Sequence, residues 1–74
     1  MKTFEEFRNE VLGWVDNCSQ RPKEWRRGQA VFNYIDEVYN IARRVQFIDG
    51  VDCFYNDDLI DQFILLAYRQ LWVG

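Results

Sequence analysis

The segment from Arg26 to Val45 constrains the fold of this chain more than any other. Its apolar residues recur at alternating steps of four and three, the spacing that stacks side chains on one face of a helix. Together with the apolar residues that flank it, this stripe covers roughly 200° of a helical wheel, whereas an ordinary surface helix needs a stripe of only about 100°. A helix with so wide an apolar arc has to be covered by two neighbours. The stripe consists of Val31, Ile35, Val38, Ala42 and Val45, with Phe32 and Tyr39 on one side and Tyr34 and Ile41 on the other.

The chain supplies one further helix on each side of this segment. Residues 4–17 follow a capping box, Thr3-x-x-Glu6, in which each residue can bond the backbone amide of the other. Residues 57–72 follow Asn56, a good helix cap. The apolar face of the first helix comprises Phe4, Phe7, Val11, Trp14, Val15 and Cys18, and that of the last comprises Ile60, Phe63, Ile64, Ala67 and Leu71.

These patterns predict an all-α fold, a three-helix bundle with helices at 4–17, 26–46 and 57–72 and the middle helix most buried. All 74 residues form a single domain, close to the lower size limit for a core without disulfides or metals. The small size of the core is offset by three Trp, four Tyr and six Phe, because each aromatic ring buries a large area.

Composition argues against an enzyme and against a cofactor. The chain has no histidine, so histidine-based catalysis and histidine metal sites are excluded, and its two cysteines have no histidine partner to activate them. The acidic residues between Asp49 and Asp61 invite a calcium site, but the EF-hand register fails and no glutamate closes it. They are better explained as an acidic turn followed by a capped helix start, and we predict no metal.

Location is predicted from what the chain omits. It has no apolar run of about 18 residues and no signal sequence, which predicts no membrane segment and a cytoplasmic protein with reduced thiols. The net charge of −3, with scattered basic residues, also argues against a nucleic-acid-binding surface.

Charged residues gather in the two connections. Four positive residues lie between Arg21 and Arg27, which suggests either an anion site at a helix N-terminus or a solvated loop. Because a 20-residue helix is about 30 Å long, we expect this segment to lie far from the acidic connection. Arg43 and Arg44 are then the expected partners of Asp49, Asp52 and Asp57, while Arg26 and Arg27 lie near the ends of the other two helices.

Two surfaces are candidate binding sites. On helix 57–72 an apolar strip would be left outside the packing face, and we predict a partner or homodimer interface there, unless the N-terminal arm or the loop 51–55 covers the strip. On helix 26–46 the polar face carries mostly uncharged hydrogen-bonding groups, which form either a recognition surface or a merely solvated face. The strip is Leu65, Tyr68 and Trp72, and the polar face is Arg26, Gln29, Asn33, Asp36 and Asn40.

Two stretches resemble a known pattern. The first runs from Arg21-Pro22 through Trp25-Arg26-x-Gly28-Gln29-Ala30-x-Phe32-Asn33, and the second is Asp52-x-Phe54-Tyr55-x-Asp57 with Ile60 and Phe63 following. Together they resemble short phage, prophage and bacterial proteins whose function is unknown. The resemblance implies no catalytic residues. It implies a small accessory protein, and one shared role for the two stretches, which could be to lock the aspartate-rich loop onto the middle helix through Arg26 or Asn33.

The predicted function is therefore a non-catalytic protein-binding module, a regulator or inhibitor that occupies a partner surface. The alternative is a helix-turn-helix-like nucleic-acid-binding protein. Against this alternative, a recognition helix should expose Arg, Lys, Asn and Gln on a basic face, and the last helix offers Arg69 and two glutamines among leucines.

Overall fold

Four α-helices make up the described part of the chain, residues 2–17 and 21–73, in the computed structural model. The all-α class is confirmed, and no strand occurs among these residues. The three-helix bundle is wrong in detail, because the predicted helix 26–46 is two helices. The elements are α1 (Phe4–Asn17), α2 (Arg27–Tyr39), α3 (Ala42–Asp49), a 3₁₀ turn η1 (Asp57–Leu59), α4 (Ile60–Tyr68) and a π-helical turn η2 (Arg69–Val73).

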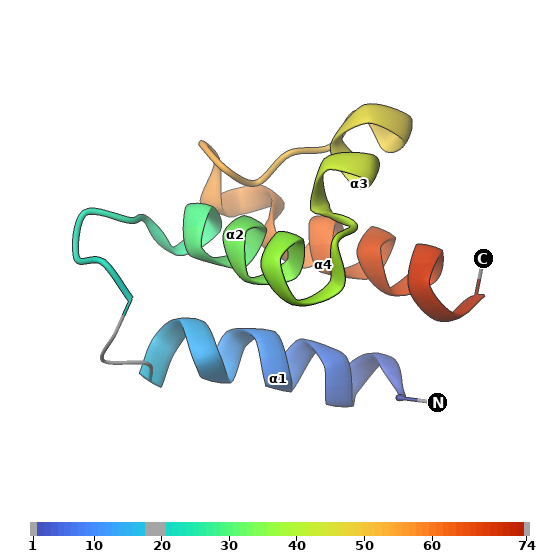
Figure 1. Ribbon diagram of the computed structural model, residues 1–74, viewed down its shortest axis with the longest axis horizontal. Coiled ribbons are helices and arrows are strands. Elements are labelled where there is room, and N and C mark those ends of the chain that lie inside the picture. Colours follow the sequence, from blue (N-terminus) through green and yellow to red (C-terminus); the bar gives the residue numbers. More distant parts are fainter. Residues whose placement is uncertain (1, 18–20, 74) are drawn as a thin grey trace.

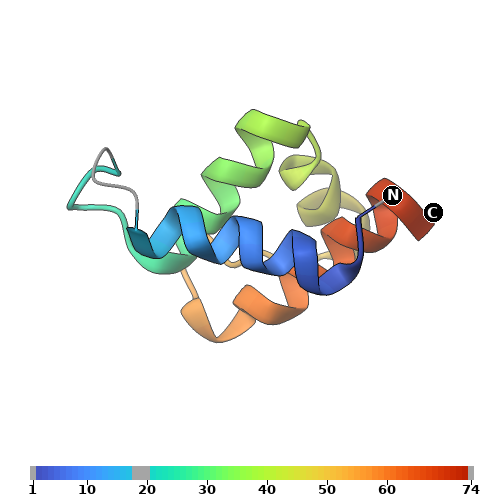
Figure 2. The ribbon, with the colours of Figure 1, turned by 90° about the horizontal axis from the view of Figure 1, so that it is seen from below.

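The helices stack in layers around one core. α1 runs along one side and packs on α2 and α4, and α3 packs on α2 and α4 from the opposite side (Figure 1). Seen from below, α1 crosses in front of both α2 and α4 (Figure 2). The two ends of the chain lie at the same end of the molecule (Figures 1 and 2). The core is continuous and includes Phe7, Val11, Val15, Ala30, Val31, Ile35, Val45, Cys53, Phe63, Ile64 and Ala67, all at most 1% exposed.

The first helix has the bounds that its sequence predicts. The Thr3 amide donates to Glu6 Oε1 at 2.9 Å and the Glu6 amide donates to Thr3 Oγ1 at 3.1 Å, so the capping box forms. Hydrogen bonds to the Glu6 carboxylate, first from the Thr3 amide and then from the Thr3 side chain, lower the pKa of Glu6. Phe7, Val11 and Val15 turn into the core as expected, whereas Cys18 lies outside the described residues.

The middle helix breaks at Asn40. This residue adopts the left-handed conformation, with φ 57° and ψ 35°, and its amide still donates to the Asp36 carbonyl at 2.9 Å. Asparagine tolerates this conformation better than other side-chain-bearing residues and is a common helix terminator for that reason. The chain then restarts at Ala42 as α3. The stripe of apolar residues did not reveal the break, because apolar residues continue on both sides of it.

The break changes which apolar residues are covered. Ile41, Ala42 and Val45 are buried because α3 turns back over α4 and α2. Val38 was predicted to lie in the core and is instead 52% exposed, since it lies at the end of α2 where the chain turns away. Val31 and Ile35, earlier in the same stripe, are fully buried as predicted.

The last helix begins as predicted and ends differently. Asn56 Oδ1 accepts from the Asp58 amide at 3.0 Å, which confirms the cap. After Tyr68 the helix widens into the π-helical turn η2, in which each residue advances by a smaller angle than in an α-helix. Trp72 therefore does not lie directly above Leu65, as seven α-helical residues would place it, but is rotated towards α1.

Candidate functional site

The strip predicted on the last helix does not form an exposed surface. Tyr68 is 9% exposed, and its hydroxyl donates to the Lys2 carbonyl at 2.7 Å. Trp72 is half-buried against Phe7 and Tyr39, with ring centroids 5.2 and 5.8 Å away. The N-terminal arm contributes only the Lys2 contact, and the rings packed on Tyr68 and Trp72 come from α1 and α2. The alternative stated above, cover by the arm or the loop 51–55, therefore holds only in part. Leu65 alone remains exposed, at 41%.

The predicted polar surface is only partly free. Arg26 and Asn40 are exposed, and Gln29, Asn33 and Asp36 are half-buried along α2. Asn40 ends α2 with its backbone, and Asp36 lies 3.6 Å from Arg43 Nε in an ion pair. The side chains of the other three residues, Arg26, Gln29 and Asn33, make none of the described hydrogen bonds or ion pairs. Their use in recognition stays a prediction.

The two stretches that carry the resemblance meet in space. The Gly28 amide donates to Asp57 Oδ1 at 2.9 Å, and the Cys53 thiol donates to the Gly28 carbonyl at 3.3 Å. Phe32 and Phe54 pack edge to face, with their centroids 5.5 Å apart. The loop is therefore locked onto the start of α2 through Gly28 and Phe32, and not through Arg26 or Asn33. The anion at this helix N-terminus is the chain's own Asp57 carboxylate.

The expected partners of Arg43 and Arg44 were wrong. Asp57 lies at Gly28, and Asp52 accepts from Gln46 Nε2 and from the Phe54 amide. The expectation rested on one straight 20-residue helix. Because the helix breaks at Asn40, the connection after α3 returns along α2 to its start.

A charge pair that the sequence did not predict forms at the end of α1. Arg27 lies near that helix end, as expected, and donates to both carboxylate oxygens of Asp16, each at 2.9 Å. The Arg27 guanidinium holds the pKa of Asp16 below its usual range, and the same bond raises the pKa of Arg27. The pair is about half exposed, so its net contribution to stability is small.

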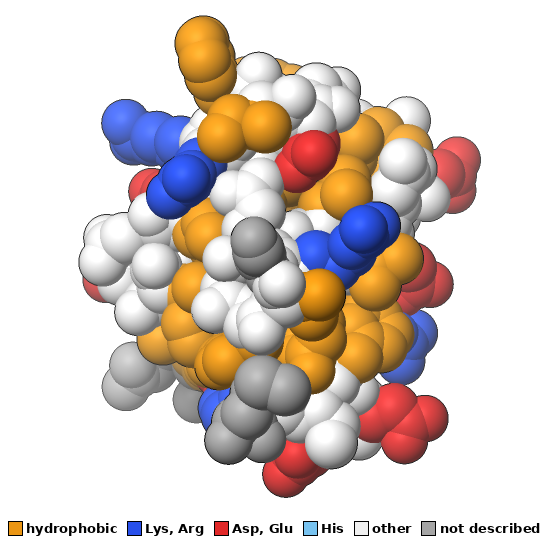
Figure 3. All heavy atoms as spheres, turned by 90° about the vertical axis from the view of Figure 1, so that its right-hand side faces the viewer, with side chains coloured by type: hydrophobic (Ala, Val, Ile, Leu, Met, Phe, Trp, Pro, Cys, Tyr) orange, Lys and Arg blue, Asp and Glu red, His pale blue; other side chains and the backbone are white. Residues whose placement is uncertain are grey.

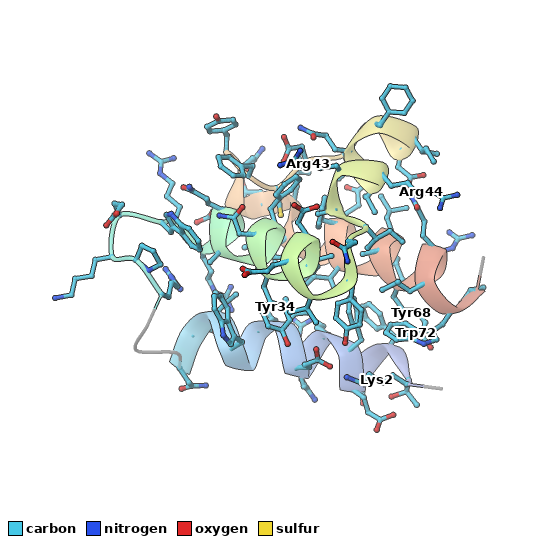
Figure 4. All side chains as sticks on the ribbon, viewed as in Figure 1. Lys2, Tyr34, Arg43, Arg44, Tyr68 and Trp72 are labelled. Carbon is cyan, nitrogen blue, oxygen red and sulfur yellow. The ribbon has the colours of Figure 1, made fainter. Side chains whose placement is uncertain are left out.

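A polar cluster links the N-terminal arm, α1 and α2. Glu10 accepts from the hydroxyls of Tyr34 and Tyr39, each at 2.7 Å, and also pairs with Lys2. Burial raises the pKa of both tyrosines. Figure 4 shows Tyr34 pointing from α2 towards α1. The contacts of this cluster tie the N-terminal arm, α1 and α2 together.

We expect Glu10→Ala to lower the free energy of unfolding by about 1–3 kcal/mol, because two half-buried hydroxyls lose their shared acceptor. Glu10→Gln keeps one acceptor oxygen and should lose less. Urea unfolding followed by circular dichroism would measure both. A greater loss for the Gln variant than for the Ala variant would show that packing or charge, and not the hydrogen bonds, governs this site.

Each of the remaining reactive side chains makes its own separate contact. Cys53 is fully buried, and burial raises the pKa of its thiol to about 12, so it is a poor nucleophile at neutral pH. Asp49, Asp52, Asp57 and Asp61 each have a different partner, Gln70, Gln46, Gly28 and Arg8 respectively. Among residues 2–17 and 21–73, no group of three side chains is arranged to hold a metal ion.

An exposed apolar surface lies on α3 instead of α4. Phe47 is 89% exposed and its neighbour Ile48 is 59% exposed, although α3 has only eight residues. Arg44 precedes them by three and four residues, the spacing that places side chains on one helix face. Val73, from η2, is 64% exposed. Figure 3 shows hydrophobic side chains at the top of the molecule, over α3, next to Lys and Arg side chains.

Two shallow hollows connect α3 with the end of the chain. One, of about 260 Å³, is lined by Arg44, Ile48, Asp49 and Gln70. The other, of about 310 Å³, is lined by Leu66, Arg69 and Val73, and shares Asp49 and Gln70 with the first. We call Arg44, Phe47, Ile48, Arg69 and Val73 the α3 surface.

A buried acceptor lies between the two hollows of the α3 surface. Gln70 Nε2 donates to Asp49 Oδ2 at 2.7 Å, while Gln70 Oε1 is buried with no hydrogen-bond partner among the described residues. Exchanging the two atoms would turn an oxygen towards the carboxylate, so the observed orientation is the favourable one. An unmet buried acceptor costs about 1–3 kcal/mol.

Sequence reasoning missed the α3 surface because it treated residues 26–46 as one helix. In a continuous helix Phe47 and Ile48 fall just beyond the end, where isolated apolar residues need no explanation. The signal that could have found the surface is Asn40, an asparagine between two apolar stretches.

Comparison of the chain with protein-family models, with curated proteins and with solved structures gives no match. In the described part of the chain no helix is both long and apolar enough to cross a membrane.

Proposed function

We propose that this protein is a non-catalytic binding module that docks onto a partner protein through the α3 surface. The observation that carries the proposal is Phe47, a whole aromatic side chain left 89% exposed beside Ile48. Fully burying such a side chain gains about 1.5–3 kcal/mol. A rigid aromatic residue next to an arginine is the combination that dominates the energy of protein interfaces.

The charges on the α3 surface indicate an acidic partner. Arg44 and Arg69 are exposed, and neither forms an ion pair with a described residue, although the chain as a whole carries −3. Figure 4 shows Arg44 pointing towards the end of the chain and Arg43 towards the opposite side of α3. A carboxylate on the partner would therefore meet Arg44 or Arg69 at the rim of the apolar contact.

A second copy of this chain is a poor occupant, because a two-fold contact brings the same patch against itself, and the charged members of the α3 surface, Arg44 and Arg69, have the same sign. We expect the purified protein to be monomeric by light scattering.

The resemblance of the two stretches to phage, prophage and bacterial proteins supports an accessory role in the cytoplasm of a bacterial host. A module of this kind acts as a regulator or inhibitor by occupying a partner's surface. The nucleic-acid alternative is favoured less, because Arg43 faces Asp36 and Gln46 faces Asp52, which leaves α3 without a continuous basic edge.

The test is site-specific photo-crosslinking in host cells from position 47, with position 55 as the matched control. Tyr55 is also aromatic and 81% exposed, but it lines a hollow on the Arg43 side of α3. We expect one protein to be crosslinked from position 47 and not from position 55, with nuclease treatment making no difference. Crosslinks that disappear with nuclease would support the nucleic-acid alternative.

With that partner purified, Phe47→Gln should weaken binding by roughly thirtyfold, the effect of losing about 2 kcal/mol at an interface centre. Arg44→Gln should weaken binding less and reduce its salt dependence. Tyr55→Gln should leave the affinity unchanged. Equal affinities for the Phe47→Gln variant and the unsubstituted protein would exclude the α3 surface as the docking site.

A further inference from the structure

A further hollow, separate from those at α3, lies between the end of α1 and the outer side of α2. It has a volume of about 520 Å³ and is lined by Trp14, Pro22, Trp25, Tyr34, Glu37 and Val38. We call it the aromatic cleft. Its volume falls within the range of about 300–1,000 Å³ that is typical of ligand pockets. Figure 4 places Tyr34 between α1 and α2, away from Arg44 on α3.

The walls of the aromatic cleft are held in place by contacts that also tie α1 to α2. Trp14 and Tyr34 stack with their centroids 5.0 Å apart and their planes 34° from parallel. The Tyr34 hydroxyl is fixed by its bond to Glu10 at 2.7 Å. The ring contact and the hydrogen bond hold Trp14 and Tyr34, which form the floor of the cleft, in place before a ligand binds. This lowers the entropy lost on binding.

The opposite wall is clamped by Arg21. Its guanidinium donates to the Val15 carbonyl at 2.5 Å and to the Trp25 carbonyl at 3.1 Å, joining the last turn of α1 to the connection. The Trp25 amide also donates to the Pro22 carbonyl at 3.1 Å, so Pro22 and Trp25 form one turn. Arg21 thus builds the wall, with its donors directed at backbone carbonyls.

The chemistry of the lining on the Glu37 side, away from Arg21, suits a positive charge with an apolar stem. The face of an aromatic ring is negative and attracts ammonium and guanidinium groups, with tryptophan the strongest. Tyr34 donates its hydroxyl proton to a carboxylate, which leaves its ring more electron-rich. Glu37 is exposed at the rim and forms no ion pair with a described residue, while Val38 offers 52% of its surface to an alkyl chain.

We propose that the aromatic cleft binds a lysine side chain from a basic segment of a partner protein. The alkyl stem would lie on Val38 and the aromatic floor, and the ammonium group would lie between the ring faces and the Glu37 carboxylate. The proposal is independent of the α3 surface, which calls for an acidic partner. The carboxylate at the rim repels a phosphate-bearing ligand from this side of the cleft.

The test uses the chain's own three tryptophans as reporters. Trp14 and Trp25 line the aromatic cleft, and Trp72 packs on Phe7 at the other end of α1. In proton–nitrogen NMR spectra, Nα-acetyl-lysine amide should shift the indole signals of Trp14 and Trp25 and leave that of Trp72 in place. The neutral Nε-acetyl derivative has a longer stem and no charge, and should bind about tenfold more weakly because the cation–π and charge contributions are gone.

Glu37→Gln is the matched variant, since it removes the charge from an exposed position and leaves the shape of the rim nearly unchanged. We expect it to weaken binding of the lysine derivative about threefold or more and to leave binding of the acetylated derivative unchanged, with an unaltered urea midpoint. Equal binding of the two derivatives would show that the cleft takes apolar or proline-rich segments, and would overturn the proposal. Equal shifts at Trp72, or an unaffected Glu37→Gln variant, would overturn it as well.

Discussion

Phe7→Ala should lower the free energy of unfolding by about 3–5 kcal/mol, the usual cost of truncating a fully buried aromatic residue. Phe7 is 0% exposed and touches three other rings, with its centroid 5.3 Å from that of Tyr39, 6.1 Å from that of Tyr68 and 5.2 Å from that of Trp72. No side chain nearby is flexible enough to fill the space that the ring would leave. A domain of this size has a total stability of only about 4–11 kcal/mol, so the variant would be at the edge of folding.

Phe47→Ala is the matched control, because the same atoms are removed from a side chain that is 89% exposed. Its cost should stay within about 0.5 kcal/mol. Urea unfolding of both variants, followed by circular dichroism at constant pH, would measure the difference. Similar losses for the two would mean that Phe47 packs against the protein in solution, and would remove the main support for the α3 surface.

Local rules predicted those parts of the fold that depend on neighbouring residues. The bounds of α1, its capping box and the Asn56 cap follow from side chains that bond backbone amides two or three residues away. The burial of Val31 and Ile35 follows from helical periodicity. Periodicity failed at Asn40, because a left-handed residue reverses the chain without interrupting the apolar pattern. It failed again at η2, where a wider turn rotates Trp72 towards α1 and leaves it half-buried.

The errors in the predicted sites follow from these two failures of helical periodicity. An α-helical end would have left Trp72 beside Leu65, and the predicted interface would have been exposed there. Arg43 shares a hollow with Asp52 and Arg44 shares one with Asp49, but these two carboxylates bond Gln46 and Gln70 instead. The aromatic cleft was not visible in the sequence at all, because Trp14 fits the apolar face of α1 and Trp25 lies in a connection. Only the tertiary arrangement brings both to the same side of Tyr34.

Gly28→Ala should destabilise the protein by about 3 kcal/mol, although replacing glycine by alanine inside a helix normally stabilises by about 1 kcal/mol. A Cβ atom at this position would overlap the Cys53 carbonyl oxygen and lie 2.8 Å from Asp57 Oδ1 and 3.2 Å from the Cys53 carbonyl carbon. Two of these three atoms are backbone and cannot move without displacing the loop. The expected loss is at the upper end of the range of about 1–3 kcal/mol for overpacking.

Gly13→Ala is the internal control, because a Cβ there would meet nothing within 4 Å and Gly13 is in the middle of α1. It should raise the urea midpoint, whereas Gly28→Ala should lower it.

A second readout of Gly28→Ala follows Cys53, whose thiol lies 3.3 Å from the Gly28 carbonyl and is fully buried. If the loop lifts from α2, alkylation of Cys53 under native conditions, located by peptide mass mapping, should become many times faster in the Gly28→Ala variant. The contrary result would be that Gly28→Ala raises the urea midpoint, as Gly13→Ala does, and that Cys53 stays protected from alkylation. Gly28 would then not be required for the close approach of the second stretch to the first. The shared role of the two stretches would then have to be sought on the exposed side chains of Arg26 and Tyr55.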